Sequence, residues 1–168
     1  MNKSNFKDMM NNVKINLDLL PVERKKLSAH KIKFQDIPKF TVKDLSVMLS
    51  IPTIRAMELY ALAEFQSIPS IGIKFSRDLI SLGYYSLDEL KDKEGAKLIE
   101  DLEFLTGAWI DPCVEDQCRL VVHYANNRDN TKRWWDFTAE RKTYRIAHGY
   151  QENRPEKAWH ELQQYDPK

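Results

Sequence analysis

Apolar and polar positions along residues 34–90 follow a pattern that occurs twice, at a constant offset of 31 residues. The segment 34–38, Phe-Gln-Asp-Ile-Pro, recurs at 65–69 as Phe-Gln-Ser-Ile-Pro. The positions that follow keep their character, as in the pairs Val42 and Ile73, Lys43 and Lys74, Ser50 and Ser81, and Leu59 and Leu90. Self-similarity at a fixed period indicates one supersecondary unit used twice.

Each copy predicts a turn followed by a helix. Ile-Pro opens both copies, and proline disfavours helix because it lacks an amide donor and crowds the residue before it. In the first copy Thr41 and Asp44 form a helix-capping signal, which predicts a helix that ends near residues 50–52. A further helix is predicted over 53–65, with one face formed by Ile54, Met57, Ala61, Leu62 and Phe65.

The second copy predicts the same elements. Gly72 supplies a residue that adopts positive φ without cost, and Gly83 is a natural helix stop. Helical spacing lies between them, in Ile73, Ser76, Leu79 and Ile80. Ser86 and Glu89 form a capping box that predicts one more short helix. We therefore predict an all-α fold of tandem helix-hairpin-helix units with a C-terminal helical cap.

Residues 68–76, Ile-Pro-Ser-Ile-Gly-Ile-Lys-Phe-Ser, resemble a helix-hairpin-helix motif, in which two glycines flank an apolar residue and a lysine follows. Gly72 and Lys74 match the motif, whereas Ser70 replaces the first glycine. The resemblance implies a phosphate contact at the hairpin, where amides and the positive end of a helix dipole converge. The residues expected to contact DNA are Ser70, Ile71, Gly72, Ile73, Lys74 and Arg77, with Lys39 and Lys43 of the first copy extending the footprint.

The first copy departs further from the motif. Lys39, Phe40 and Thr41 replace its whole glycine hairpin, so we expect this copy to be degenerate as a phosphate site. The alternative for both copies is a packing scaffold that binds no ligand.

A second resemblance covers residues 31–137. Their order and spacing are similar to a small bacterial family named after a pathogenicity locus, some members of which carry a mitomycin-resistance label. The segments that carry this resemblance are Ile68–Gly72, Leu79–Gly83, Leu87–Leu90, Leu105–Gly107, Asp111–Val114 and Trp134–Trp135. The family defines no catalytic residues, so the resemblance implies no active site. A more distant likeness is to the carboxy-terminal domain of competence regulators, which uses similar hairpins.

Composition agrees with a folded helical chain. Of the 168 residues 42% are hydrophobic and 30% charged, and five are glycine, which argues against disorder and favours helices over sheet. No stretch approaches the roughly 18 apolar residues of a membrane helix, and the first residues lack a signal region. We therefore expect a cytoplasmic protein. The predicted parts are an N-terminal arm or short helix (1–30), the tandem domain (31–140), and a polar, aromatic tail (141–168), packed on the domain or partly flexible.

Charge is unevenly distributed, although its sum is only +1. Residues 22–43 hold seven basic side chains against two acidic ones, whereas 86–116 hold ten acidic against three basic. A third segment, 128–145, has six basic residues against three acidic. One positive and one negative face are therefore expected, and a positive face suits a polyanion. The alternative is that both are solvated helix surfaces.

A helix is also predicted from Asp111, with aspartate as N-cap and Pro112 at the first helical position. Cys118 falls on its apolar face, which predicts a small core residue. Cys113, Cys118 and His123 follow one another at five-residue intervals, about 140° around a helix, so they cannot converge on a metal ion.

Motifs for catalysis are missing from the sequence. It contains no nucleophile elbow, Cys–His signature, phosphate loop or dinucleotide fingerprint. Glu100, Asp101 and Glu103 have the spacing of an exposed helix face. We therefore expect neither an enzyme nor a cofactor.

Trp134 and Trp135 precede the basic residues Arg141, Lys142 and Arg145. Aromatic and cationic side chains together can bind a single strand by stacking and charge. Because buried tryptophan contributes a large apolar area, we expect these two rings to close the core instead. From residue 143 onward the chain is polar and irregular, except for a short helix after Pro155 that docks on the body.

The function predicted from the sequence is non-catalytic, largely sequence-independent DNA binding through the hairpin. The alternative is a protein–protein interaction module in which the hairpins are scaffold and the partner binds the acidic stretch 86–116 or the aromatic tail. The oligomeric state is not predicted.

Overall fold

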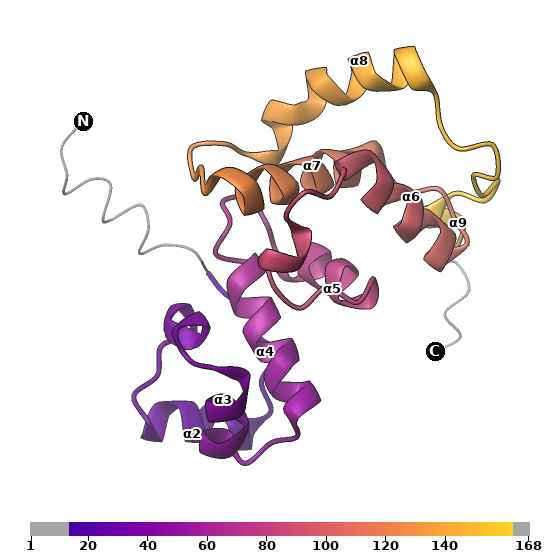
Figure 1. Cartoon of the computed structure of the whole chain (residues 1–168). Coiled ribbons are helices and arrows are strands. Elements are labelled where there is room, and N and C mark those ends of the chain that lie inside the picture. Colours follow the sequence, from indigo (N-terminus) through magenta and orange to yellow (C-terminus); the bar gives the residue numbers. More distant parts are fainter. Residues whose placement is uncertain (1–13, 163–168) are drawn as a thin grey trace. The chain divides into compact units, whose positions relative to one another are not determined.

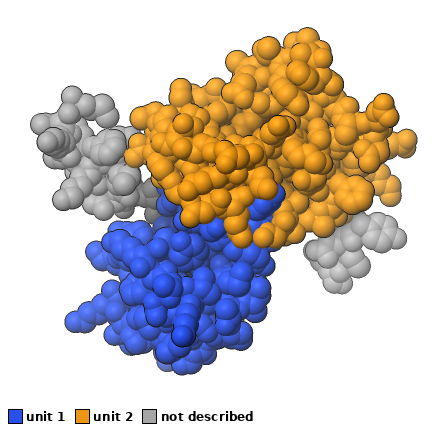
Figure 2. Space-filling view, in the orientation of Figure 1, with its two compact units in different colours: residues 1–80, 84–86 blue, residues 81–83, 87–168 orange. Residues whose placement is uncertain are grey.

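The computed structural model describes residues 14–162, and every regular element within this range is a helix (Figure 1). The all-α prediction is therefore confirmed. The chain forms two compact units (Figure 2): unit 1 comprises residues up to 80 with 84–86, and unit 2 comprises 81–83 and the residues from 87 onward. The ends of the predicted arm and tail, residues 1–13 and 163–168, lie outside the described residues.

The helices of unit 1 are α2 (Pro21–Ala29), the 3-10 helix η1 (Phe34–Lys39), α3 (Val42–Leu49), α4 (Thr53–Phe65) and α5 (Ile73–Ser81), whose last residue counts with unit 2. Unit 2 contains η2 (Asp88–Leu90), α6 (Gly95–Thr106), α7 (Pro112–Asn127), η3 (Trp134–Phe137), α8 (Thr138–His148) and α9 (Trp159–Leu162). No single helix in the described range is long and apolar enough to cross a membrane; α3 and α4 meet that test only as a pair bent by 115°.

Two turns of unit 1 are related by the 31-residue offset of the sequence repeat. Helices α3 and α5 begin at positions related by the predicted offset, and the turn before each is closed by the same hydrogen bond. The amide of Phe40 donates to the carbonyl of Ile37, and that of Ile71 to Ile68, each at 3.1 Å. Ile37 and Ile68, whose carbonyls accept these hydrogen bonds, are both fully buried. In the first copy the predicted turn is the 3-10 helix η1, which contains Pro38.

Local capping sets the ends of α3 and α4 as predicted. The Thr41 hydroxyl accepts from the amide of Asp44 at 3.1 Å, and Ser50 ends α3 with a φ of 48°. Helix α4 follows directly after Pro52. Of the apolar face predicted for α4, Ala61, Leu62 and Phe65 are buried and Ile54 is exposed, and Ala56 and Leu59 are buried in addition.

Residues 14–20 form an arm without helical structure that polar side chains hold to the rest of unit 1. Gln66, itself buried, donates to the carbonyl of Asn16 at 2.6 Å and accepts from its amide at 3.0 Å. Arg55 donates to the carbonyl of Asp18 and binds both oxygens of the buried Glu23. The arm therefore lies against the start of the turn that joins α4 and α5.

Unit 2 is organised around α7. Asp111 accepts from the amide of Cys113 at 2.8 Å, and Pro112 is the first helical residue, as predicted. Cys118 is buried in the core, also as predicted. The short helix after Pro155 is present as α9, and its first residue, Trp159, donates its amide to the carbonyl of Trp109 at 2.9 Å. The helix predicted from Ser86 is reduced to the three-residue turn η2.

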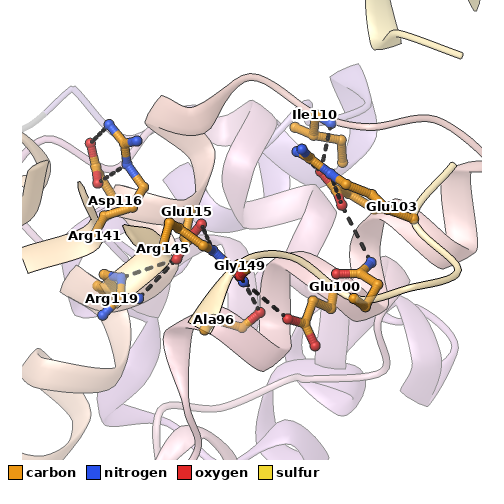
Figure 3. Close-up of polar contacts among 12 residues, drawn as sticks. Ala96, Glu100, Glu103, Ile110, Glu115, Asp116, Arg119, Arg141, Arg145 and Gly149 are labelled. Atoms are coloured by element: carbon orange, nitrogen blue, oxygen red, sulfur yellow. Dashed lines mark hydrogen bonds and ion pairs between the residues drawn. The ribbon is translucent and has the colours of Figure 1, made fainter. Parts of the chain in front are cut away.

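Helix α8 contradicts the prediction of an irregular tail from residue 143. Arg141 is its one buried residue, and Ile146 is 88% exposed. Ion pairs hold it to α7 (Figure 3): Arg141 binds Asp116 at 2.7 Å, and Arg145 binds Glu115 at 2.9 Å. The hydrophobic pattern could not reveal α8, because arginines occupy its inner face.

Acidic side chains of the stretch 86–116 are partly internal. Glu103 was expected on an exposed helix face, but it is buried and bound by Arg154 at 2.7 Å. Glu115 and Asp116 are buried too, under the arginines of α8. The expected negative face is therefore incomplete, since three of its acids pair inside unit 2 with basic residues from later in the chain.

The first prediction concerns Gly95, where α6 approaches α7. A Cβ at this position would lie 2.6 Å from Cγ and 2.8 Å from Cα of Arg119. We expect Gly95→Ala to lower the free energy of unfolding by about 1–3 kcal/mol, the usual cost of overpacking, as measured by urea denaturation followed by circular dichroism. Gly72→Ala is the control, because a Cβ there meets nothing within 4 Å. Equal stability of Gly95→Ala and the parent would contradict the close approach.

Candidate nucleic-acid interface

Helices α4 and α5 are joined by the turn 66–72. In the second copy the residues predicted to contact DNA begin within this turn, at Ser70, and continue into α5. Ile68 and Ile71 are buried beneath the turn, while Ser70 and Gly72 are exposed at its surface. The hydrogen bond from the amide of Ile71 to the carbonyl of Ile68 closes the turn. The buried side chains of Ile68 and Ile71 thus hold the backbone segment whose amides are predicted to contact a phosphate.

The backbone strain of the turn lies at a different residue from the one expected. Ser70 has a φ of 65°, whereas Gly72 does not lie in the left-handed region. Ser70 stands where the motif has its first glycine, and that conformation explains why the motif places glycine there. Gly72 is required neither by its own dihedral angles nor by packing, since a Cβ on it would meet nothing within 4 Å.

Gly72 also precedes the first residue of α5. The amide and the hydroxyl of Ser76 both donate to its carbonyl, at 3.1 and 2.9 Å. The first turn of any α-helix has amides without intrahelical partners, and an anion near them is favoured by the helix dipole. Because glycine has no side chain, residue 72 cannot itself cap these amides.

The equivalent position of the first copy is Thr41. Its hydroxyl accepts from the amide of Asp44, so a side chain of the protein occupies the start of α3. This contrast fits the expectation that the first copy is degenerate as a phosphate site. The second copy has an exposed glycine in the same place.

The basic residues predicted for the site all lie at the surface of unit 1. Arg77 forms an ion pair with Asp18 of the arm 14–20, and Lys39 binds Asp36 at 2.6 Å. Lys43 and Lys74 are exposed, on α3 and α5 respectively. Lys74 is the second residue after Gly72 and lies on the first turn of α5, and Arg77 lies about one turn further along the same helix.

Asp78 is an acidic residue near the site that sequence analysis did not identify. It lies one helical turn after Lys74, and burial raises its pKa from the ordinary value to about 6, while the charge of Lys74 opposes that rise. Sequence spacing alone gave no sign of it, because the shift depends on burial. Near neutral pH its negative charge acts against any anion at the start of α5.

A cavity of about 390 Å³ lies elsewhere, within unit 2. Arg119, His123 and Tyr144 are among the residues that line it. Arg119 is paired with Glu115 and Glu140, and His123 is bonded to Asp129 at 3.2 Å. None of the residues expected to contact DNA lines this cavity.

A family model described as Pathogenicity locus matches residues 58–143, just over half of the chain. The chain therefore belongs to the Pathogenicity locus family, which confirms the resemblance seen in the sequence. The match includes the turn 66–72 and all of α5, α6 and α7, and it begins after α3. No curated protein and no solved structure matches the chain.

The second prediction tests the left-handed conformation of Ser70. Glycine adopts positive φ readily, whereas for a residue with a Cβ this conformation is less stable by about 1–2 kcal/mol. We expect Ser70→Gly to unfold at a higher urea concentration than Ser70→Ala, by about 1 kcal/mol in free energy once the greater flexibility of unfolded glycine is included. Both variants lack the hydroxyl, so its loss cancels in the comparison. An alanine variant as stable as the glycine variant would argue against this backbone geometry.

Proposed function

We propose that this protein is a non-catalytic DNA-binding protein whose turn 70–74 is a helix-hairpin-helix contact for a backbone phosphate. The observation that carries the proposal is Gly72: it is exposed, it immediately precedes a helix, and neither its φ nor its packing requires glycine. A residue without a side chain in that place lets a ligand approach the amides of the helix start closely.

Charge supports the same site. Lys74 provides a cation directly beside the amides, and Arg77 becomes available if phosphate displaces Asp18 from an ion pair in which both side chains are more than half exposed. Exposed pairs of this kind contribute little free energy, so the exchange is inexpensive. Lys43, and Lys39 on giving up its exposed pair with Asp36, extend the positive surface along the first copy.

Such a site contacts phosphate and makes no contact with the edges of the bases. Phosphate contacts position a protein on DNA without selecting a sequence. The proposed activity is therefore binding with little base selectivity, in which the number of phosphates engaged appears as the dependence of affinity on salt.

The third prediction concerns this salt dependence. The slope of log affinity against log salt should be about −0.9 for each phosphate contacted on duplex DNA. Lys74→Gln should reduce the magnitude of that slope by about 0.9 and weaken binding to all sequences alike, as measured by fluorescence anisotropy with labelled duplexes. Gly72→Val should weaken binding while circular dichroism remains that of the parent.

Lys157→Gln is the matched control, because it also removes the charge of an exposed lysine, but from unit 2. It should leave affinity for duplex DNA and the salt slope nearly unchanged. Salt-independent binding, or no binding at low salt, would refute the proposal and favour the protein-interaction alternative.

The fourth prediction is a pH dependence set by Asp78. Its pKa of about 6 means that the carboxylate is mostly charged at pH 7.5 and mostly neutral at pH 5. Because the negative charge repels phosphate, affinity for DNA should rise as the pH falls through 6. Asp78→Asn should bind severalfold more tightly than the parent at pH 7.5 and equally at pH 5.

Any other group whose charge changes over this range does so in both proteins, so the ratio of the two affinities isolates Asp78. A ratio that stays constant between pH 5 and 7.5 would exclude Asp78 from the interface.

A further inference from the structure

Trp135 lies at the surface of unit 2, although the sequence predicted that both tryptophans of this segment close the core. It belongs to η3, a single turn of 3-10 helix in which side chains three residues apart point the same way. Trp134 and Phe137 therefore share one side, and Phe137 is 8% exposed. Trp135 projects in another direction and is 54% exposed.

The exposed ring is held in a defined orientation. The rings of Trp134 and Trp135 meet edge to face, with centroids 5.4 Å apart and planes at 82°. Asp136 accepts from the amide of Arg133 at 2.8 Å, which fixes the start of η3. Immediately after η3, the hydroxyl of Thr138 donates to the buried Asp116 at 2.8 Å. Hydrogen bonds thus hold the chain on both sides of Trp135. Little further ordering of this residue is therefore needed when a ligand binds its ring.

The loop before η3 contains basic residues that lie close to Trp135 in the sequence. Residues 128–133 include Arg128, Lys132 and Arg133, and Lys132 is exposed. The one acid of this loop is already engaged: Asp129 binds the amide and hydroxyl of Thr131 at 2.9 and 2.6 Å, contacts that hold its pKa down to about 2. The lysine next to the aromatic turn remains available to a phosphate.

We propose that Trp135 stacks on an unpaired base of a single-stranded nucleic acid, with Lys132 contacting the adjoining phosphate. An exposed indole presents a flat face, and only a base outside a duplex offers its own face in return. The inference extends the proposed DNA binding, but it rests on unit 2 alone and does not require the turn at Gly72.

Phe104 shows that exposure alone does not define such a surface. It is 77% exposed on α6 in the same unit, yet its neighbours along that helix include Glu100 and Asp101. Acidic neighbours repel a phosphate backbone, so Phe104→Ala is the matched control for the loss of an exposed aromatic ring.

The fifth prediction is tested by fluorescence anisotropy with oligothymidylate, oligouridylate, an abasic strand and a duplex, all of one length. Stacking on one base is worth about 1–3 kcal/mol. Trp135→Ala should therefore weaken binding of the oligothymidylate about tenfold and leave the abasic strand and the duplex nearly unchanged. Trp135→Phe should retain most of the affinity, and Phe104→Ala all of it. The oligouridylate arm establishes whether RNA shares the contact.

Four results would overturn the inference: no binding of single strands, equal affinity of Trp135→Ala and the parent for oligothymidylate, equal losses on the abasic and base-bearing strands, or an equal loss in Phe104→Ala. Failure of the hairpin proposal is recognised separately, because it appears in the duplex measurements with Gly72→Val and Lys74→Gln. A surface that binds protein instead would give the first of these results.

Discussion

Buried carboxylates determine how the less apolar parts of this chain are held. Among the described residues Glu23, Glu103, Glu115 and Asp116 are almost fully buried, and each is bound by at least one arginine distant in sequence or on another element. A buried charge without a partner is strongly destabilising, so each carboxylate fixes the segment that supplies its arginine. In this way Arg55 of α4 is tied to α2, and the arginines of α8 and of the loop after it are tied to α6 and α7. Segments with few apolar residues thereby gain a defined place.

The same constraint explains which elements the sequence could reveal. Helices α3, α4, α5 and α7 begin where local signals place them, because Thr41, Pro52, Gly72 and Asp111 act within one turn of the helix start. Helix α8 could not be predicted, since its inner face consists of arginines whose partners lie 25 to 30 residues earlier. Long-range pairing of this kind leaves no periodic pattern. The exposure of Trp135 was missed for a related reason, because the three-residue repeat of one 3-10 turn is too short to recognise.

The candidate site could be located from sequence but not understood in detail. Its position followed from the repeat and from Gly72, whereas the strain at Ser70, the ion pair of Arg77 with Asp18 and the raised pKa of Asp78 all depend on tertiary contacts. Residues matched by the family model include both the turn 66–72 and the aromatic turn at Trp135, but not the first copy of the repeat. Two candidate surfaces, one in each unit, therefore fall within the part of the chain that defines the family.

The proposed DNA binding requires that a phosphate lies against the backbone amides at the start of α5. Amide correlation spectra of nitrogen-labelled protein, recorded while short duplex DNA is added, test it directly because they report each amide separately. If the phosphate binds there, the amide signals of Gly72, Ile73 and Lys74 will shift progressively. The signals of Thr41 and Val42, at the capped start of α3, will move much less. Shifts confined to other regions, with the signals of residues 70–75 unmoved at saturation, would contradict it.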